Sequence, residues 1–147
     1  MARWEFVVIP TFLSNRDAFI AIIDRGFSKG DLSIADEICA NDLVEHQYPI
    51  KPHLAGAEIL KDQITSARAT VHNLTLVPEQ IAEVGDAVWA LLRGSGIEAR
   101  SGKPVNFYVM DICRFKDGRL IEHWGVPDRF AMLHQVGAFP VGRPPGS

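Results

Sequence analysis

The sequence predicts an α+β fold, in which a curved antiparallel sheet forms a cone-shaped barrel with three N-terminal helices packed across it and a short C-terminal helix. Apolar residues recur at helical spacing through most of the first half of the chain. The second half instead has four successive runs rich in β-branched and aromatic residues. Helices segregated from an antiparallel sheet define an α+β domain, and a curved sheet under helices encloses a pocket.

The first half predicts three helices and one short strand. Ser14 is a candidate N-cap for a helix that buries Phe19 and ends near Gly30. A second, short helix follows Asp31 and includes Cys39, and a third follows Gly56. Between these last two helices, the segment LVEHQY predicts a strand over residues 43–48.

The second half predicts a meander of strands. Runs of strand-forming residues cover 73–84, 86–97, 105–115 and 120–126. Asp128 is then expected to cap a closing helix, with Arg129 beside it as a surface or interface charge.

Size and charge restrict the class of protein. The 147 residues fit one domain, with an N-terminal arm over 1–13, a core over 14–137 and a flexible tail over 138–147. There are 15 basic and 18 acidic side chains, which gives a net charge of -3 without any basic run, so nucleic acid is not an expected partner.

The cysteines and the N-terminal segment predict the compartment. Cys39 and Cys113 lie in apolar surroundings without metal-binding spacing, so both are expected to be buried free thiols. The segment MARWEFVVIPTFLS has neither the pattern of a signal peptide nor the length of a membrane span. We therefore expect a cytoplasmic protein with no membrane partner.

The last two strands form a hairpin whose turn sets the pairing of their side chains. Asp117-Gly118 allows a two-residue type I′ turn, but the segment also suits a type I turn closed by Gly118 as a bulge. The second turn is preferred because only Gly118 then needs a positive φ. It places Asp111 directly opposite His123, whereas the two-residue turn places Asp111 opposite Trp124.

The preferred pairing brings an acid and a base together on an apolar face. Residues directly opposite each other have Cβ atoms about 4.5–5.5 Å apart, so the Asp111 carboxylate would reach the His123 imidazole. Phe107, Val109, Cys113, Phe115, Ile121 and Gly125 are expected on the same face. The pair is a candidate catalytic dyad, and the alternative is a buried hydrogen bond that fixes the register.

Other residues are candidates for binding a substrate. We expect His46 and Tyr48 at the edge of the cavity. The aromatic side chains of Trp89, Phe107 and Trp124, together with Val109, are candidates for its lining, and the alternative for the aromatic residues is ordinary core packing. The histidines have no ligand spacing, and no metal site is expected.

Three segments resemble the SnoaL-like polyketide cyclases, which belong to the cone-shaped fold class named after nuclear transport factor two. The segments are RGFSKGDL at 25–32, LVEH at 43–46 and, above all, DICRFKDGRLIEHW at 111–124. The resemblance covers about residues 14–137. It implies aldol-type ring closure of an aromatic polyketide ester without a cofactor.

The resemblance also implies an acid/base Asp after the Trp of the last strand, opposite a His on the preceding strand. Here Gly125 follows Trp124, and the preceding strand carries Asp111. Our hypothesis is that the roles are exchanged between the strands, so that Asp111 orients His123 and His123 is the general base near neutral pH.

The expected function is that of a cofactor-independent acid/base enzyme acting on a hydrophobic carbonyl compound, most like a polyketide cyclase that performs an intramolecular aldol-type cyclisation (an ester cyclase) or an isomerase, in the lyase or isomerase class. A polyketide, a terpenoid and a small ester are all compatible with the sequence as substrates. The alternatives are a non-catalytic ligand-binding or assembly module, or a hydrolase with water held by Asp111. The strand face with Tyr108, Met110, Ile112 and Trp124 is also apolar, which predicts a dimer or larger homo-oligomer.

Overall fold

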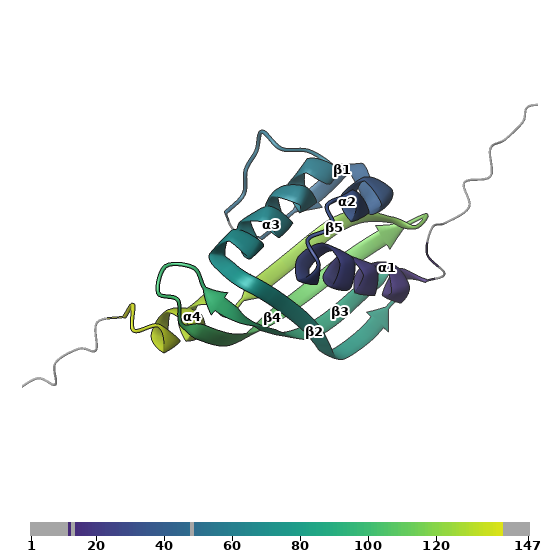
Figure 1. The fold of residues 1–147 in the computed structure, drawn as a ribbon. Coiled ribbons are helices and arrows are strands. Elements are labelled where there is room, and N and C mark those ends of the chain that lie inside the picture. Colours follow the sequence, from purple (N-terminus) through teal and green to yellow (C-terminus); the bar gives the residue numbers. More distant parts are fainter. Residues whose placement is uncertain (1–11, 13, 48, 140–147) are drawn as a thin grey trace, which may run out of the picture.

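Helices cover one face of a curved, five-stranded sheet (Figure 1). The computed structural model describes residues 12, 14–47 and 49–139. The predicted N-terminal arm and tail lie almost wholly outside these residues. The elements in chain order are α1 (Asn15–Ala21), η1 (Ile22–Ser28), α2 (Ser33–Ile38), β1 (Cys39–Glu45), α3 (Ala57–Thr70), β2 (Val71–Val84), β3 (Ala87–Glu98), β4 (Pro104–Lys116), β5 (Arg119–Pro127) and α4 (Arg129–Gln135).

The first predicted helix is present, but its second half is a π-helix. The Ser14 side chain caps it by accepting a hydrogen bond from the Asp17 N–H, and Gly30 follows its end with a φ of 75°. Gly26 lies where η1 meets α3, and a Cβ there would come within 2.9 Å of Ile64 Cδ1. The absence of a side chain at this point lets the two helices pack closely over the sheet.

The strands are arranged in the order β1-β5-β4-β3-β2. The four strands of the predicted meander pair antiparallel, whereas β1 pairs parallel to β5. The strand that the sequence predicts over 43–48 spans Cys39–Glu45 in the structure. It thus starts earlier than predicted, and Cys39 lies in this strand and not in the preceding helix. Within the described part of the chain the sheet has two edges, β1 and β2, so the α+β cone is curved but not closed.

The two faces of the sheet differ in burial. Along β4 the side chains alternate, with Val105, Phe107, Val109, Asp111, Cys113 and Phe115 buried on the helix-covered face. Tyr108 and Met110 point to the opposite face and are exposed. Both cysteines are free and buried, as the sequence predicts. None of the helices in the described ranges has the length and apolar character needed to cross a membrane.

Candidate active site

The β4–β5 hairpin has the two-residue turn and not the longer turn that we predict from the sequence. Lys116 pairs with Arg119, and both Asp117 (φ 50°) and Gly118 (φ 73°) have positive φ, which identifies a two-residue type I′ turn. Asp tolerates the left-handed region better than most residues. The longer turn avoids a positive φ at Asp117, but this advantage was too small to decide the turn type. The predicted pairing of Asp111 with His123 is therefore wrong.

A β-bulge nevertheless returns His123 to the face of Asp111. The register shifts between Arg114 and Phe115, because Arg114 pairs with Glu122 while Phe115 pairs with Leu120. Ile121 is the extra residue, and its expected place on the inner face was also wrong. Beyond the bulge, Asp111 pairs with Gly125, so His123 lies diagonally across the ladder on the inner face.

His123 lies between two carboxylates. Its Nε2 is 2.8 Å from Asp111 Oδ1, and its Nδ1 is 2.8 Å from Glu45 Oε2. The side chains of all three residues are at least 90% buried, with exposed fractions of 10% for His123 and 8% for each acid. The predicted hydrogen bond between Asp111 and His123 is thus present, but it belongs to a group of three.

Glu45 is the member of this group that sequence reasoning missed. It comes from β1, whose parallel pairing places Glu45 beside His123. The available signal was alternation, because Glu45 is two residues from Leu43, whose side chain is buried. The parallel pairing of β1 with β5 joins two segments far apart in the sequence and has no local signature. The contact between Glu45 and His123 was therefore not predictable.

The two carboxylates control the charge of the imidazole. Burial alone lowers the pKa of His123, but Asp111 and Glu45 outweigh burial and raise that pKa to about 10. The ring is therefore an imidazolium near neutral pH. An imidazolium has no lone pair for a proton, so the raised pKa argues against His123 and for Asp111 as the general base near neutral pH. The catalytic role of either residue stays a prediction.

Gly125 makes room for the group. A Cβ at this position would lie 2.9 Å from Asp111 Oδ1 and 2.2 Å from Gln47 Oε1. The missing side chain lets Asp111 lean across the ladder to His123. It also lets the Gln47 amide enter from the segment after β1, where the Gln47 N–H donates to Glu45 Oε1 at 2.6 Å.

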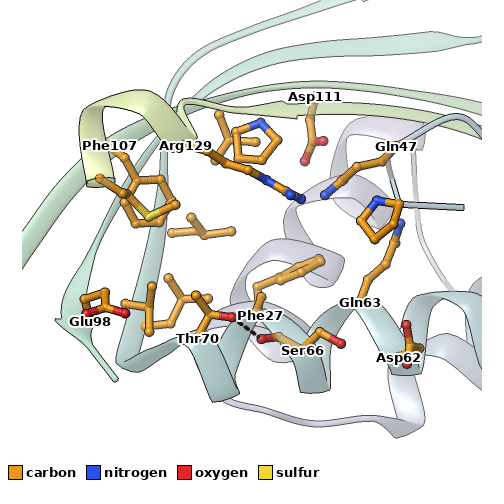
Figure 2. A pocket seen from close by; sticks show the side chains of 18 of the residues that line it. Phe27, Gln47, Asp62, Gln63, Ser66, Thr70, Glu98, Phe107, Asp111 and Arg129 are labelled. Carbon is orange, nitrogen blue, oxygen red and sulfur yellow. Dashed lines mark hydrogen bonds between the residues drawn. The ribbon is translucent and has the colours of Figure 1, made fainter. Parts of the chain in front are cut away.

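A cavity of about 450 Å³ lies between the sheet and the helices (Figure 2). Asp111 and His123 line it together with Phe107 and Val109, and the Asp111 carboxylate points into it. The wall near β2 and α4 is mainly apolar, and includes Val71, Leu74, Leu76, Met132, Leu133 and Val136. A cavity of this size, whose lining combines apolar side chains with several polar groups, suits a small hydrophobic ligand that carries polar atoms.

Three other candidates for substrate binding do not line this cavity. Trp89 and Trp124 are on the outer face of the sheet, where the strand alternation directs their side chains, and Trp89 is 44% exposed. The His46 ring stacks on Trp124, with centroids 4.5 Å apart, and its Nε2 is 3.0 Å from Glu122 Oε2. Tyr48 lies outside the described residues.

The start of α4 contributes a cation to the cavity. Asp128 caps α4 as predicted, since its side chain accepts a hydrogen bond from the Ala131 N–H at 2.9 Å. Arg129 lines the cavity rather than forming only a surface charge, and Figure 2 shows its guanidinium end directed to the region of Gln47 and Asp111. Among the described residues, no three His, Cys, Asp or Glu side chains are placed to hold a metal ion.

Fold and site together define a helix-covered, cone-shaped sheet with buried acid and base groups in an apolar cavity. The family model of the SnoaL-like polyketide cyclases matches residues 18–136. The chain belongs to this family, as the three sequence segments had indicated. No curated protein matches the chain.

Solved structures of similar proteins agree with this assignment. A candidate polyketide cyclase from Bacillus cereus ATCC 10987 is 26% identical, with a TM-score of 0.69 over 85% of this chain and 79% of that one. IdmH from Streptomyces antibioticus, also described as a candidate polyketide cyclase, is 25% identical, with a TM-score of 0.72 over 83% and 97%. A protein from Catenulispora acidiphila DSM 44928 with a ketosteroid isomerase-like fold has the same TM-score at 14% identity, over 90% and 100%, and shares the fold.

Proposed function

We propose that the protein is a cofactor-independent acid/base enzyme that acts on a hydrophobic carbonyl compound, as an aldol-type cyclase or an isomerase. The observation that carries the proposal is the Asp111 carboxylate, which is buried, points into an apolar cavity and is held by the His123 imidazolium. Membership of the SnoaL-like family and the candidate cyclases among similar structures support the same class of reaction.

In this proposal Asp111 is the general base and His123 orients it. The carboxylate removes a proton from the carbon beside a carbonyl group, and the resulting enolate either attacks a second carbonyl or is reprotonated elsewhere. The imidazolium holds one oxygen of Asp111, and Glu45 keeps the imidazolium charged and fixes its orientation. Apolar walls exclude water from the enolate.

The cavity favours an enzyme over an assembly module. A module that serves only for assembly needs no inner space, whereas here about 450 Å³ is open beside two buried ionisable groups. Burying a carboxylate and an imidazole costs several kcal/mol unless something compensates. A catalytic role would explain why the chain buries both groups beside a cavity despite this energetic cost.

The test is the exchange of carbon-bound protons for deuterium in an enolisable hydrophobic ketone. 2-Tetralone in heavy water is followed by NMR with the wild-type protein and with Asp111→Asn. We expect the enzyme-dependent exchange rate to fall at least about a hundredfold, the usual contribution of a general base. The matched control is Asp86→Asn, because Asp86 pairs with Arg114 away from the cavity. Equal exchange by wild type and Asp111→Asn would refute the proposal.

We also propose that the protein forms a homodimer through the outer face of the sheet. Trp89, Ile112 and Trp124 form one row of neighbouring side chains across β3, β4 and β5, and Leu91, Met110 and Val126 form the next. Trp89, Met110 and Val126 are exposed in a single copy. Met110→Asp should convert the dimer into a monomer in sedimentation analysis, and a wild-type protein that sediments as a monomer would contradict this proposal.

A further inference from the structure

Three ionisable side chains, Glu45, Asp111 and His123, meet at the Asp111 end of the cavity. Two carboxyl groups, those of Glu45 and Asp111, contact the single imidazole of His123. Acidic groups therefore outnumber the basic group in this cluster. An enolate formed beside Asp111 would add negative charge next to these acids, which is costly without a further cation.

The described part of the cavity wall supplies two permanent cations, in different places. The Lys51 ammonium is bound to Asp62, with Nζ 2.8 Å from Oδ2 and 2.9 Å from Oδ1. Arg129 instead directs its guanidinium to the end of the cavity where Asp111 and Gln47 point (Figure 2). A guanidinium has five N–H donors, so it can keep a protein partner and still hold a ligand oxygen.

The side of the cavity formed by α4 and β4 favours an apolar body. Met132 and Leu133 of α4 and Val136 directly after it line this side, together with Phe107 and Val109 of β4. A ligand with its hydrophobic part against these side chains would present its polar end to Arg129, Gln47 and Asp111. That orientation brings a carbon next to the polar end of the ligand close to the carboxylate.

We propose that Arg129, assisted by the Gln47 amide, is an anion-binding site for the substrate, and that the substrate is an apolar carbonyl compound that carries a carboxylate. Guanidinium and carboxylate groups form paired, charge-assisted hydrogen bonds that fix orientation as well as contribute affinity. The same cation stabilises the negative charge of the enolate. This inference rests on the proposed function, because it assigns the substrate class of the same site.

The test compares two probes that differ only in charge. Binding of 1-hydroxy-2-naphthoate and of its neutral primary amide is measured by calorimetry at pH 7.5 and low salt. We expect the wild-type protein to bind the acid at least about tenfold more tightly than the amide. Arg129→Met should remove this preference by weakening only the acid, and Arg129→Lys should retain part of it.

Arg16→Met is the matched control, because it also removes one cation but lies at the start of α1, where its N–H bonds Glu83. It should keep the full preference for the acid. Equal affinity of wild type for acid and amide would overturn the anion site, and so would an unchanged preference in Arg129→Met.

A separate variant distinguishes failure of this inference from failure of the proposed function. Asp111→Asn removes a negative charge near the proposed anion site, so its preference for the acid should persist or increase. If this variant still exchanges ketone protons at the wild-type rate, the catalytic role of Asp111 fails while the anion site stands. If exchange is lost but the acid preference does not depend on Arg129, the anion site fails and the proposed function stands.

Discussion

Two histidines, one on β5 and one directly after the neighbouring strand β1, show that the same chemical groups have different consequences on the two faces of one sheet. His123 of β5 and His46, directly after β1, are joined by a backbone hydrogen bond from His46 N–H to His123 O of 2.9 Å. Each ring contacts a carboxylate. The His123 side chain is 10% exposed and lies between two acids, whereas the His46 side chain is 38% exposed and stacks on Trp124.

This difference separates a site for chemistry from a surface contact. Inside, water cannot screen the charges, so the imidazolium and the carboxylates depend on one another. Outside, Glu122 also binds Arg114, and solvent weakens every pair in that network. A His–carboxylate contact is therefore a poor indicator of function until its burial is known.

Removal of the inner ring should have the largest effect. His123→Gln leaves the Asp111 and Glu45 carboxylates buried without the cation between them, and we expect the free energy of unfolding to fall by about 3–5 kcal/mol. Urea denaturation measures this loss. His46→Gln is the matched control and should cost much less, so equal losses for the two variants would show that burial does not decide their roles.

The inner ring should also make stability depend on pH. The pKa of His123 is about 10 in the folded chain, against about 6.5 when unfolded, so its protonation favours folding. This stabilisation is complete below about pH 6.5 and is lost as the pH rises through about 10. The advantage of wild type over His123→Gln in urea denaturation should therefore shrink between pH 6 and pH 10. An advantage that grows with pH would contradict the raised pKa.

Removal of one inner acid should have a smaller effect. Glu45→Gln deletes one of the two carboxylates on the imidazolium while keeping a hydrogen-bonding group of similar shape. We expect the pKa of His123 to fall by about one unit or more, which corresponds to about 1.4 kcal/mol. NMR titration of the ring measures this pKa. Glu122→Gln is the control on the outer face and should leave the pKa of His123 unchanged.

The smallest effect on stability is expected from Glu122→Gln itself. Its contacts with His46 and Arg114 lie on the solvent-facing side of the sheet, where salt and water already weaken them. Its urea denaturation curve at high salt should overlay that of wild type. A loss approaching that of His123→Gln would mean that the outer network also holds the sheet together.

Much of the fold could be predicted because its signals are local. The cap at Ser14, the alternation along β4 and the turn residues Asp117-Gly118 each depend on nearby residues. The parallel pairing of β1 with β5 could not be predicted, because it joins segments far apart in the chain. The boundary between α2 and β1 was also missed, since Ile38, Cys39 and Ala40 form a short apolar run across it with no Gly or Pro to mark the end of the helix.

The contact between Asp111 and His123 was predicted correctly from an incorrect register. The predicted irregularity lies in the turn, whereas the structure has a regular two-residue turn and an extra residue at Ile121. Either irregularity returns His123 to the inner face of the sheet. The face on which His123 lies was therefore predictable, whereas the residue paired with Asp111 was not. Arg129 was assigned to the surface because sequence alone does not show that α4 closes one side of the cavity.

Gly125 restricts how this sequence can evolve. The first carbon of any side chain there would come within 2.2 Å of Gln47 Oε1, so that amide would have to move. A lineage that acquired an acidic residue after Trp124 would thus also need a new rotamer or a new residue at position 47, on a separate segment of the chain. The effect of a substitution at position 125 therefore depends on position 47, which is a case of epistasis between positions far apart in the sequence.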